Sequence, residues 1–327
     1  MYQKNESRTL TLVAAAVTLL GATALTGCGG GSTVEPEVNR LPSGVTDLGA
    51  KAYRATATGA ANTAAGQDLL TAGLGKSGIA STALATLTAF VDPANPTADE
   101  LRRNAIQSNY RGLVDNTANG GYGVLYGPNI DLAGKNTLGE GLVPGLEYVG
   151  VLDDGSGRKR VTMAVQVPDS FDVSAPCIVV GPSSGSRGVY GAIGSAGDWG
   201  LKRGCAVALT DAGKGMGLYD LGDDTVHRID GTRATRTVAG TLSNFAANIT
   251  DAARAAFNTA FPNRVAFKQA HSQINPEKDW GKVTLQAVEM AYYVLNERYG
   301  VLARDGSSRI VRLTPKSEQL VSELGPL

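Results

Sequence analysis

This chain has no excess of positive or negative charge. The sequence holds 30 Lys and Arg residues against 30 Asp and Glu residues, so its formal net charge at pH 7 is zero. No acidic or basic tail stands out. Because nucleic-acid binding depends on a basic patch, we expect no nucleic-acid partner.

Aromatic residues and long apolar runs are also scarce. Phe, Trp and Tyr make up 6% of the 327 residues, whereas glycine contributes 42, which predicts many loops and small-residue contacts. The apolar stretch 10–25 falls short of the roughly 20 residues that a membrane-spanning helix needs. With 43% apolar residues, the chain can still bury a sizeable core.

The amino end is typical of a bacterial export signal. A positively charged start precedes the apolar stretch, and Leu25-Thr-Gly-Cys28 follows it. This phrase resembles a lipobox, in which cleavage occurs before a cysteine that is then acylated. We therefore expect an exported lipoprotein, anchored to the membrane through Cys28 on the periplasmic or outer-membrane side. An ordinary secretory signal, which would leave the protein secreted, is the alternative.

Cysteine and histidine are rare after this segment. Cys177 and Cys205 are the remaining cysteines. A disulfide between them suits an oxidising compartment, but we favour the alternative of two separate buried thiols. His227 lies near Asp223 and Asp224, yet no second histidine or cysteine occurs at ligand spacing, so we expect a solvated loop and no metal.

The centre of the chain carries the clearest fold signal. Two short apolar runs, residues 177–180 and 205–209, flank a Gly/Ser-rich loop and a helix candidate. This pattern predicts a βαβ crossover between parallel strands. In open α/β sheets ligands bind beyond the carboxyl ends of such strands, so residues 181–188 are where we look for a functional site.

Three further elements have recognisable patterns. Residues 145–152 and 160–167 predict a β-hairpin. Thr97 and Glu100 predict a capping box before a helix over 101–114. Apolar residues at helical spacing predict a second helix over Trp280–Tyr299, which Gly300 would end.

An antiparallel hairpin followed by a βαβ unit is how α/β-hydrolase sheets begin. The expected fold class is therefore α/β: the amino-terminal part of an α/β-hydrolase-like, mostly parallel sheet, preceded by an irregular and helical extension. The expected segments are a signal peptide over 1–27, a flexible tether and linker over 28–67, the extension over 68–140, a partial hydrolase domain over 141–300 and a divergent tail over 301–327.

The loop after residue 180 has two catalytic interpretations. In an α/β hydrolase the loop after the third strand supplies an oxyanion-hole N–H, so Ser186 N–H is our candidate donor and Gly185 lets the backbone turn. A plain Gly/Ser loop is the alternative. Gly181-Pro-Ser-Ser-Gly185 also matches the G-x-S-x-G pattern, which makes Ser183 a fallback nucleophile. Pro182 before it, the single preceding crossover strand and the lack of a helix-forming run after Gly185 argue against that role.

Several long phrases together resemble one known family. They are residues 145–148, 153–159, 183–193, 197–207 and 271–289, and the match also takes in 68–78 and 101–132. The resemblance is to the bacterial D-(-)-3-hydroxybutyrate oligomer hydrolases and extends from about Asp68 to Gly300. It implies a serine esterase that cleaves short 3-hydroxybutyrate oligomers during poly(3-hydroxybutyrate) degradation, with no cofactor.

The resemblance does not transfer a catalytic triad. It implies a nucleophilic serine in a Ser-x-Ser-Asn-Gly-Gly phrase shortly after the helix Trp280–Tyr299, and the sequence lacks that phrase. Both His227 and His271 precede that position, whereas this fold orders its triad as Ser, acid, His. We expect a truncated chain whose activity the sequence leaves open. A non-catalytic exported lipoprotein that binds oligomers or acts as a scaffold is the alternative.

The expected truncation also bears on the sheet. Only residues 310–313 of the tail have the character of a strand that could cover the parallel strand pair. An uncovered apolar strand edge favours association. We therefore expect an open sheet edge and self-association through it.

Overall fold

The computed structural model describes residues 36–59, 62–80, 82, 90–185, 187–215, 217–314 and the backbone of 320–323. The expected signal peptide, Cys28 and Ser186 lie outside these residues. Contacts divide the chain into Met1–Pro36 and Glu37–Leu327, and the described helices and strands belong to the second unit. In the described part, no helix combines the length and apolarity that crossing a bilayer requires.

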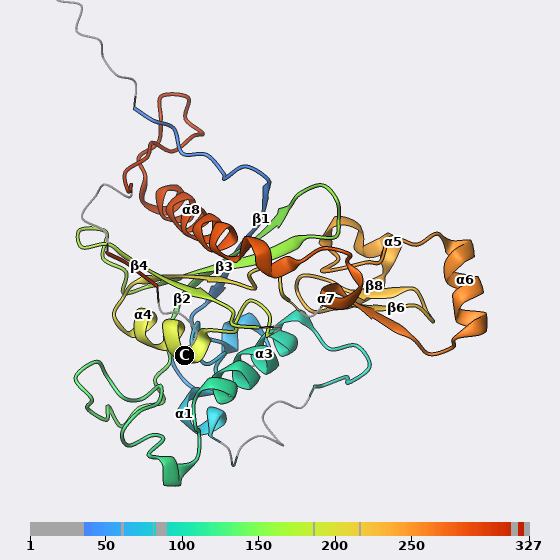
Figure 1. Ribbon diagram of the computed structural model, residues 1–327. Coiled ribbons are helices and arrows are strands. Elements are labelled where there is room, and N and C mark those ends of the chain that lie inside the picture. Colours follow the sequence, from blue (N-terminus) through green and yellow to red (C-terminus); the bar gives the residue numbers. More distant parts are fainter. Residues whose placement is uncertain are drawn as a thin grey trace, which may run out of the picture. The chain divides into compact units, whose positions relative to one another are not determined.

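A six-stranded sheet with the order β1-β2-β3-β5-β4-β10 organises this unit (Figure 1). Its strands are β1 (Val45–Tyr53), β2 (Gly145–Asp153), β3 (Arg160–Pro168), β4 (Cys177–Pro182), β5 (Ala206–Thr210) and β10 (Leu320–Glu323). The pairings β1·β2, β2·β3 and β3·β5 are antiparallel, whereas β5·β4 and β4·β10 are parallel. The fold is mixed α/β, but the expectation of a mostly parallel sheet is wrong. The hairpin pairs directly with β5, a neighbour relation that strand periodicity does not reveal.

The predicted hairpin and crossover are both present. β2 and β3 pair from Gly145 opposite Pro168 to Asp153 opposite Arg160. β4 leads through the short helix α4 (Asp198–Lys202) to β5, and the two strands are parallel. Every residue of β3 is buried, because both faces of the sheet are covered by other elements.

Helices cover the two faces of the sheet (Figure 1). On one face, α8 (Trp280–Tyr299) packs its buried Ala287, Ala291 and Leu295 with β3, β4 and β5 in one apolar cluster. On the other, α1 (Gly75–Ile79) and α3 (Ala98–Leu113) share a second cluster with the opposite side of β4 and β5. The predicted helix Trp280–Tyr299 is confirmed. So is the capping box, in which Glu100 N donates to Thr97 Oγ1 and Thr97 N to Glu100 Oε2.

A second, four-stranded antiparallel sheet has the order β8-β7-β6-β9. Its strands are β6 (Leu218–Asp220), β7 (Thr225–His227), β8 (Arg233–Thr235) and β9 (Val265–Phe267). Three helices belong to the same stretch of chain: α5 (Arg236–Ala239), α6 (Asp251–Ala260) and α7 (Lys268–His271). A small apolar cluster around Tyr219 and Phe245 forms its core.

Strand β1 lies within the segment that we expected to be linker. It pairs antiparallel with β2, and only its end residues, Val45 and Tyr53, are buried. Because the residues between them are exposed, neither face of β1 has to be apolar, and its sequence does not alternate between apolar and polar residues. Backbone pairing at the edge of the sheet holds it, so the sequence pattern gave no sign of it.

We expected an open edge at β4, and this expectation is also wrong. β10 pairs with β4 in parallel, with Leu320 opposite Cys177. Residues 310–313 do not form the covering strand, and Ile310 makes an isolated bridge with Val38 instead. β4 is therefore paired on both sides, and β10 is the outer strand of the described sheet.

Cys177 and Cys205 form a disulfide with an S–S distance of 2.05 Å. Our preference for two separate thiols is thus wrong. The parallel pairing of β4 and β5 places the amino ends of both strands side by side, and the two Cα atoms are 4.8 Å apart. This spacing lies within the range that a disulfide bridges.

Replacing both cysteines by alanine should lower the free energy of unfolding. The disulfide joins residues separated by 28 positions, and closing a loop of that size is worth about 3–4 kcal/mol through the unfolded chain. Urea denaturation measures the difference. Wild-type protein under reducing conditions should match the alanine variant; equal stability of the oxidised wild type and the variant would contradict the assignment.

A buried ion pair connects α3 with the sheet. Arg102 Nε and Nη2 each donate to a different oxygen of Glu147 at 3.0 Å, and both side chains are almost fully buried. Gln166 on β3 and Tyr190 after β4 also donate to this carboxylate, at 2.8 and 2.7 Å. Burial alone would raise the pKa of Glu147, but Arg102 and these hydrogen bonds outweigh it and hold that pKa below its usual value.

Glu147→Gln should lower the free energy of unfolding at pH 7 by about 3–5 kcal/mol, because it leaves Arg102 buried without its counter-ion. The pKa of Glu147 is depressed in the folded protein, so its contribution is complete above the unfolded value of about 4.3 and is lost as pH falls through the folded value. The stability difference between wild type and Glu147→Gln should therefore shrink below about pH 4.

The matched control is Glu289→Gln on α8, whose side chain is exposed. It should change the free energy of unfolding by less than about 0.5 kcal/mol. A Glu147→Gln effect as small as that of the control, or one independent of pH, would refute the role of the buried pair.

Candidate functional site

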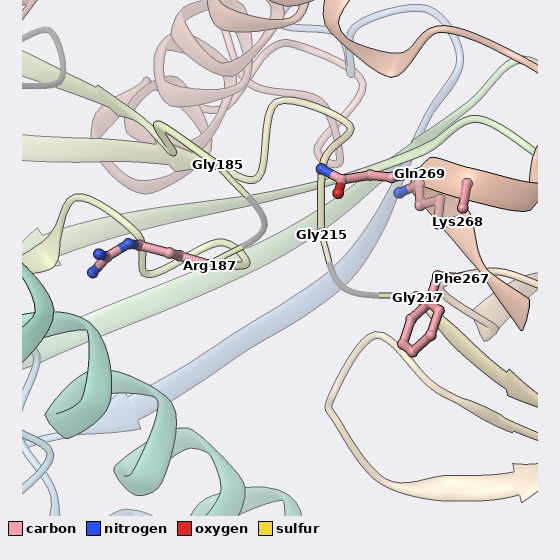
Figure 2. A pocket seen from close by; sticks show the side chains of 8 residues that line it. Gly185, Arg187, Gly215, Gly217, Phe267, Lys268 and Gln269 are labelled. Carbon is pink, nitrogen blue, oxygen red and sulfur yellow. The ribbon is translucent and has the colours of Figure 1, made fainter. Parts of the chain in front are cut away.

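A cavity of about 590 Å³ lies beyond the carboxyl ends of β4 and β5. Its lining residues come from the loops after these strands and from β9 and α7 (Figure 2): Gly185, Arg187, Gly215, Gly217, Phe267, Lys268, Gln269 and Ala270. This is the position at which open α/β sheets bind ligands. The loop singled out in the sequence thus borders the cavity, together with the loop after β5 and residues 267–270.

Ser183, the fallback nucleophile, lies directly after β4 and is fully buried. Its N–H donates to Thr210 O at 2.8 Å, and its hydroxyl donates to Gly185 O at 2.9 Å. A Cβ placed on Gly191 would come within 2.3 Å of Ser183 Oγ, so the backbone of the following turn packs against this hydroxyl. The hydroxyl is engaged inside its own loop, and no described histidine bonds to it.

Of the two oxyanion-hole candidates, Gly185 lies within the described residues and Ser186 does not. Gly185 and Arg187, on either side of Ser186, both line the cavity. The left-handed backbone conformation of the loop occurs at Gly188, with φ of 75°, rather than at Gly185. The Arg187 side chain lies against Gly112 of α3, and in Figure 2 it points away from Gln269 and Lys268.

Neither histidine lies in a catalytic setting within the described residues. Burial, together with the nearby Arg233, lowers the pKa of His227 on β7. His271 Nδ1 accepts a hydrogen bond from Phe267 N at 2.9 Å. Asp220 and Asp223 pair with Arg233, and among the residues described no three His, Cys, Asp or Glu side chains form a group that could hold a metal ion.

A buried charged pair beneath the cavity was missed from the sequence. Asp211 follows β5, and its Oδ1 accepts hydrogen bonds from Thr162 N at 3.1 Å and Gly213 N at 2.8 Å. Its Oδ2 is buried without a hydrogen bond from any described group, and Lys268 Nζ lies 3.9 Å from it. Lys268 donates to Arg160 O, and burial lowers its pKa.

Two glycines allow the loop after β5 to lie directly over this pair. A Cβ on Gly215 would come within 2.4 Å of Asp211 Oδ2, and one on Gly217 within 2.4 Å of Phe245 Cβ. These are distances that real Cβ atoms do not show. The wall of the cavity therefore depends on glycine at both positions. The sequence shows glycines at 213, 215 and 217, but it does not reveal that Lys268, far along the chain, lies beneath this loop.

The fold and the cavity define a mixed α/β protein with a ligand-sized site beyond a parallel strand pair. The chain belongs to the 3HB-oligomer hydrolase family, whose model matches residues 24–322. The match continues well past Gly300, where we expected the likeness to end. No solved structure matches the chain.

Named relatives agree with the family assignment. The chain is 54% identical over 314 residues to a D-(-)-3-hydroxybutyrate oligomer hydrolase of Polaromonas sp. (strain JS666), which covers 96% of this chain and 42% of the relative. It is 57% identical over 298 residues to a protein of the same name from Burkholderia vietnamiensis, covering 91% of this chain and 40% of the relative. The chain thus spans about two fifths of the length of the curated relatives that it matches.

Gly215→Ala should destabilise the protein by about 1–3 kcal/mol, because the new methyl group overlaps the buried Asp211 carboxylate. The control is Gly185→Ala in the facing loop, where a Cβ meets no described atom within 4 Å. It should leave stability near that of the wild type. Thermal unfolding compares the three proteins, and equal stability of both variants would show that the loop does not rest on Asp211 as described.

Proposed function

We propose that this chain provides the substrate-binding part of a carboxylic ester hydrolase that acts on 3-hydroxybutyrate oligomers in poly(3-hydroxybutyrate) degradation. The observation that carries the proposal is the cavity beyond the carboxyl ends of β4 and β5 in a member of the 3HB-oligomer hydrolase family. A short 3-hydroxybutyrate oligomer is a small molecule of methyl and ester groups that ends in a hydroxyl and a carboxylate, and cavities of this size are typical of small-molecule sites.

The proposal includes an α/β-hydrolase-like arrangement of the main sheet. It is supported by the order of elements: the hairpin β2–β3, the crossover from β4 to β5, and the long helix α8 followed by β10 beside β4. In this arrangement the loop after β4 is the oxyanion loop. The backbone N–H of Ser186 would then stabilise the negative charge that develops on the ester carbonyl oxygen, with Gly185 at the border of the same cavity.

Hydrolysis by a serine needs a base that removes the hydroxyl proton. The Ser183 hydroxyl donates to Gly185 O, and the described residues place no histidine beside it. We therefore assign Ser183 a structural role and assign substrate binding, rather than proton transfer, to the described residues. The same observation favours the second candidate function, a non-catalytic protein that binds oligomers or acts as a scaffold.

Export and membrane attachment complete the proposal. The sequence supports cleavage before Cys28 and acylation of its thiol, so the oligomers would be met outside the cytoplasm. Two acyl chains suffice for stable attachment, whereas one does not. The mass of the amino-terminal peptide of the mature protein tests this point, and an unmodified Cys28 would leave the secreted form as the alternative.

The purified chain should bind the 3-hydroxybutyrate trimer saturably in calorimetry, because the cavity is formed by residues that this chain supplies. Ser183→Ala should bind the trimer with unchanged affinity, since the hydroxyl faces its own loop rather than the cavity. Released 3-hydroxybutyrate, measured in the same samples, separates binding from hydrolysis.

Two results would change the proposal. A folded protein that binds no trimer would refute the binding role. Hydrolysis of the trimer that disappears in Ser183→Ala would show that Ser183 is the nucleophile and that its structural assignment is wrong.

A further inference from the structure

Four apolar side chains are exposed along one stretch of chain that leads to the cavity. Phe257 on α6 and Phe261 directly after it are 38% and 53% exposed, and Val265 and Phe267 on β9 are 36% and 39% exposed. The rings of Phe257 and Phe261 are 5.2 Å apart. Val265 and Phe267 lie on the same face of β9, because strand side chains alternate. We call these four residues the apolar shelf.

Helix α6 keeps this surface exposed because polar side chains attach it to the small sheet. Arg254 and Asn258 both donate to Leu221 O, and none of the residues of α6 is buried. A surface helix ordinarily turns its apolar stripe toward the core. Here the aromatic side chains at positions i and i+4 remain in solvent instead.

The apolar shelf continues into the cavity. Phe267 lines the cavity beside Lys268 and Gln269 (Figure 2). Asn263, between Phe261 and β9, has a φ of 59°, so the chain turns there before it enters β9. From that turn, Val265 and Phe267 on one face of β9 lead to the cavity.

Strand β9 also presents backbone groups along this path. Leu221 N donates to Arg264 O, and Lys268 N donates to Gly217 O. Because backbone groups in an antiparallel pair alternate between facing the partner strand and facing away from it, the N–H groups of Val265 and Phe267 point to the open edge of β9. His271 accepts from Phe267 N, which leaves the N–H of Val265 as the outward donor beside the shelf.

We propose that the apolar shelf and the open edge of β9 bind the polyester chain of a 3-hydroxybutyrate oligomer whose end occupies the cavity. This inference rests on the proposed function. Each unit of the oligomer carries a methyl group, which the Phe and Val side chains remove from water. Each ester carbonyl accepts a hydrogen bond and the polyester has no N–H of its own, which matches an edge that offers a donor.

The test compares the trimer with monomeric 3-hydroxybutyrate, which is too short to reach Phe257 and Phe261 from the cavity. In calorimetry with the full chain, Phe261→Ser should weaken trimer binding about fivefold, the effect of losing one partly buried aromatic contact. Its affinity for the monomer should remain within about twofold of the wild type. Phe257→Ser provides a second variant of the same surface.

The control is Val238→Ser on α5, a side chain that is 77% exposed and lies outside the shelf. It should bind the trimer like the wild type. All three positions are exposed, so circular dichroism should show an unchanged fold.

The outcomes separate this inference from the function on which it rests. Wild-type binding of the trimer that neither phenylalanine variant weakens would overturn the shelf and leave the proposed function intact. Equal weakening in Val238→Ser would also overturn it, because the effect would not be specific to the shelf. A wild-type protein that binds no trimer would overturn both.

Discussion

The buried ion pair between Arg102 and Glu147 joins segments that lie far apart in the sequence. Arg102 belongs to α3 and Glu147 to β2, and Arg102 also donates to Gln67 and stacks over the Tyr53 ring of β1 at 3.7 Å. Removing either charge would leave the other buried without its counter-ion, which is costly. The pair therefore determines where α3 lies against the sheet.

This constraint reaches the candidate site through the segment after β4. The Tyr190 hydroxyl donates to Glu147, and Asn109 of α3 donates to Arg187 O. The loop that borders the cavity is thus fixed to β2 through Tyr190 and to α3 through Arg187. On the other side, Asp211 and Lys268 hold the loop after β5 next to α7. The Arg102–Glu147 pair thus supports the loop after β4, and the Asp211–Lys268 pair supports the loop after β5. Both loops line the cavity.

Local patterns in the sequence predicted the elements whose formation depends on nearby residues. The capping box at Thr97, the hairpin β2–β3 and the helix α8 follow from periodicity and turn chemistry over short stretches. The crossover from β4 to β5 was predicted in the same way, and with it the position of the loop that borders the cavity.

The features that were missed depend on contacts between distant residues or on the backbone alone. β1 has no apolar alternation because it is an exposed edge strand, and the pairing of β10 with β4 is a backbone relation. The disulfide was an alternative that we did not favour, because choosing it required the register of β4 against β5. Nothing in the sequence around Lys268 distinguishes it from a surface lysine. Only the fold shows that it lies beneath the loop of Gly215 and beside Asp211.

Binding of a 3-hydroxybutyrate oligomer in the cavity beyond β4 and β5 is the central claim. Amide hydrogen exchange with and without saturating trimer tests it most directly, because it reports on each segment separately. We expect slower exchange in residues 183–191, 211–217 and 265–270, and unchanged exchange in residues 287–299 of α8, which pack on the face of the sheet opposite α3. Protection confined to α8 or to other segments, with these three unchanged, would contradict it.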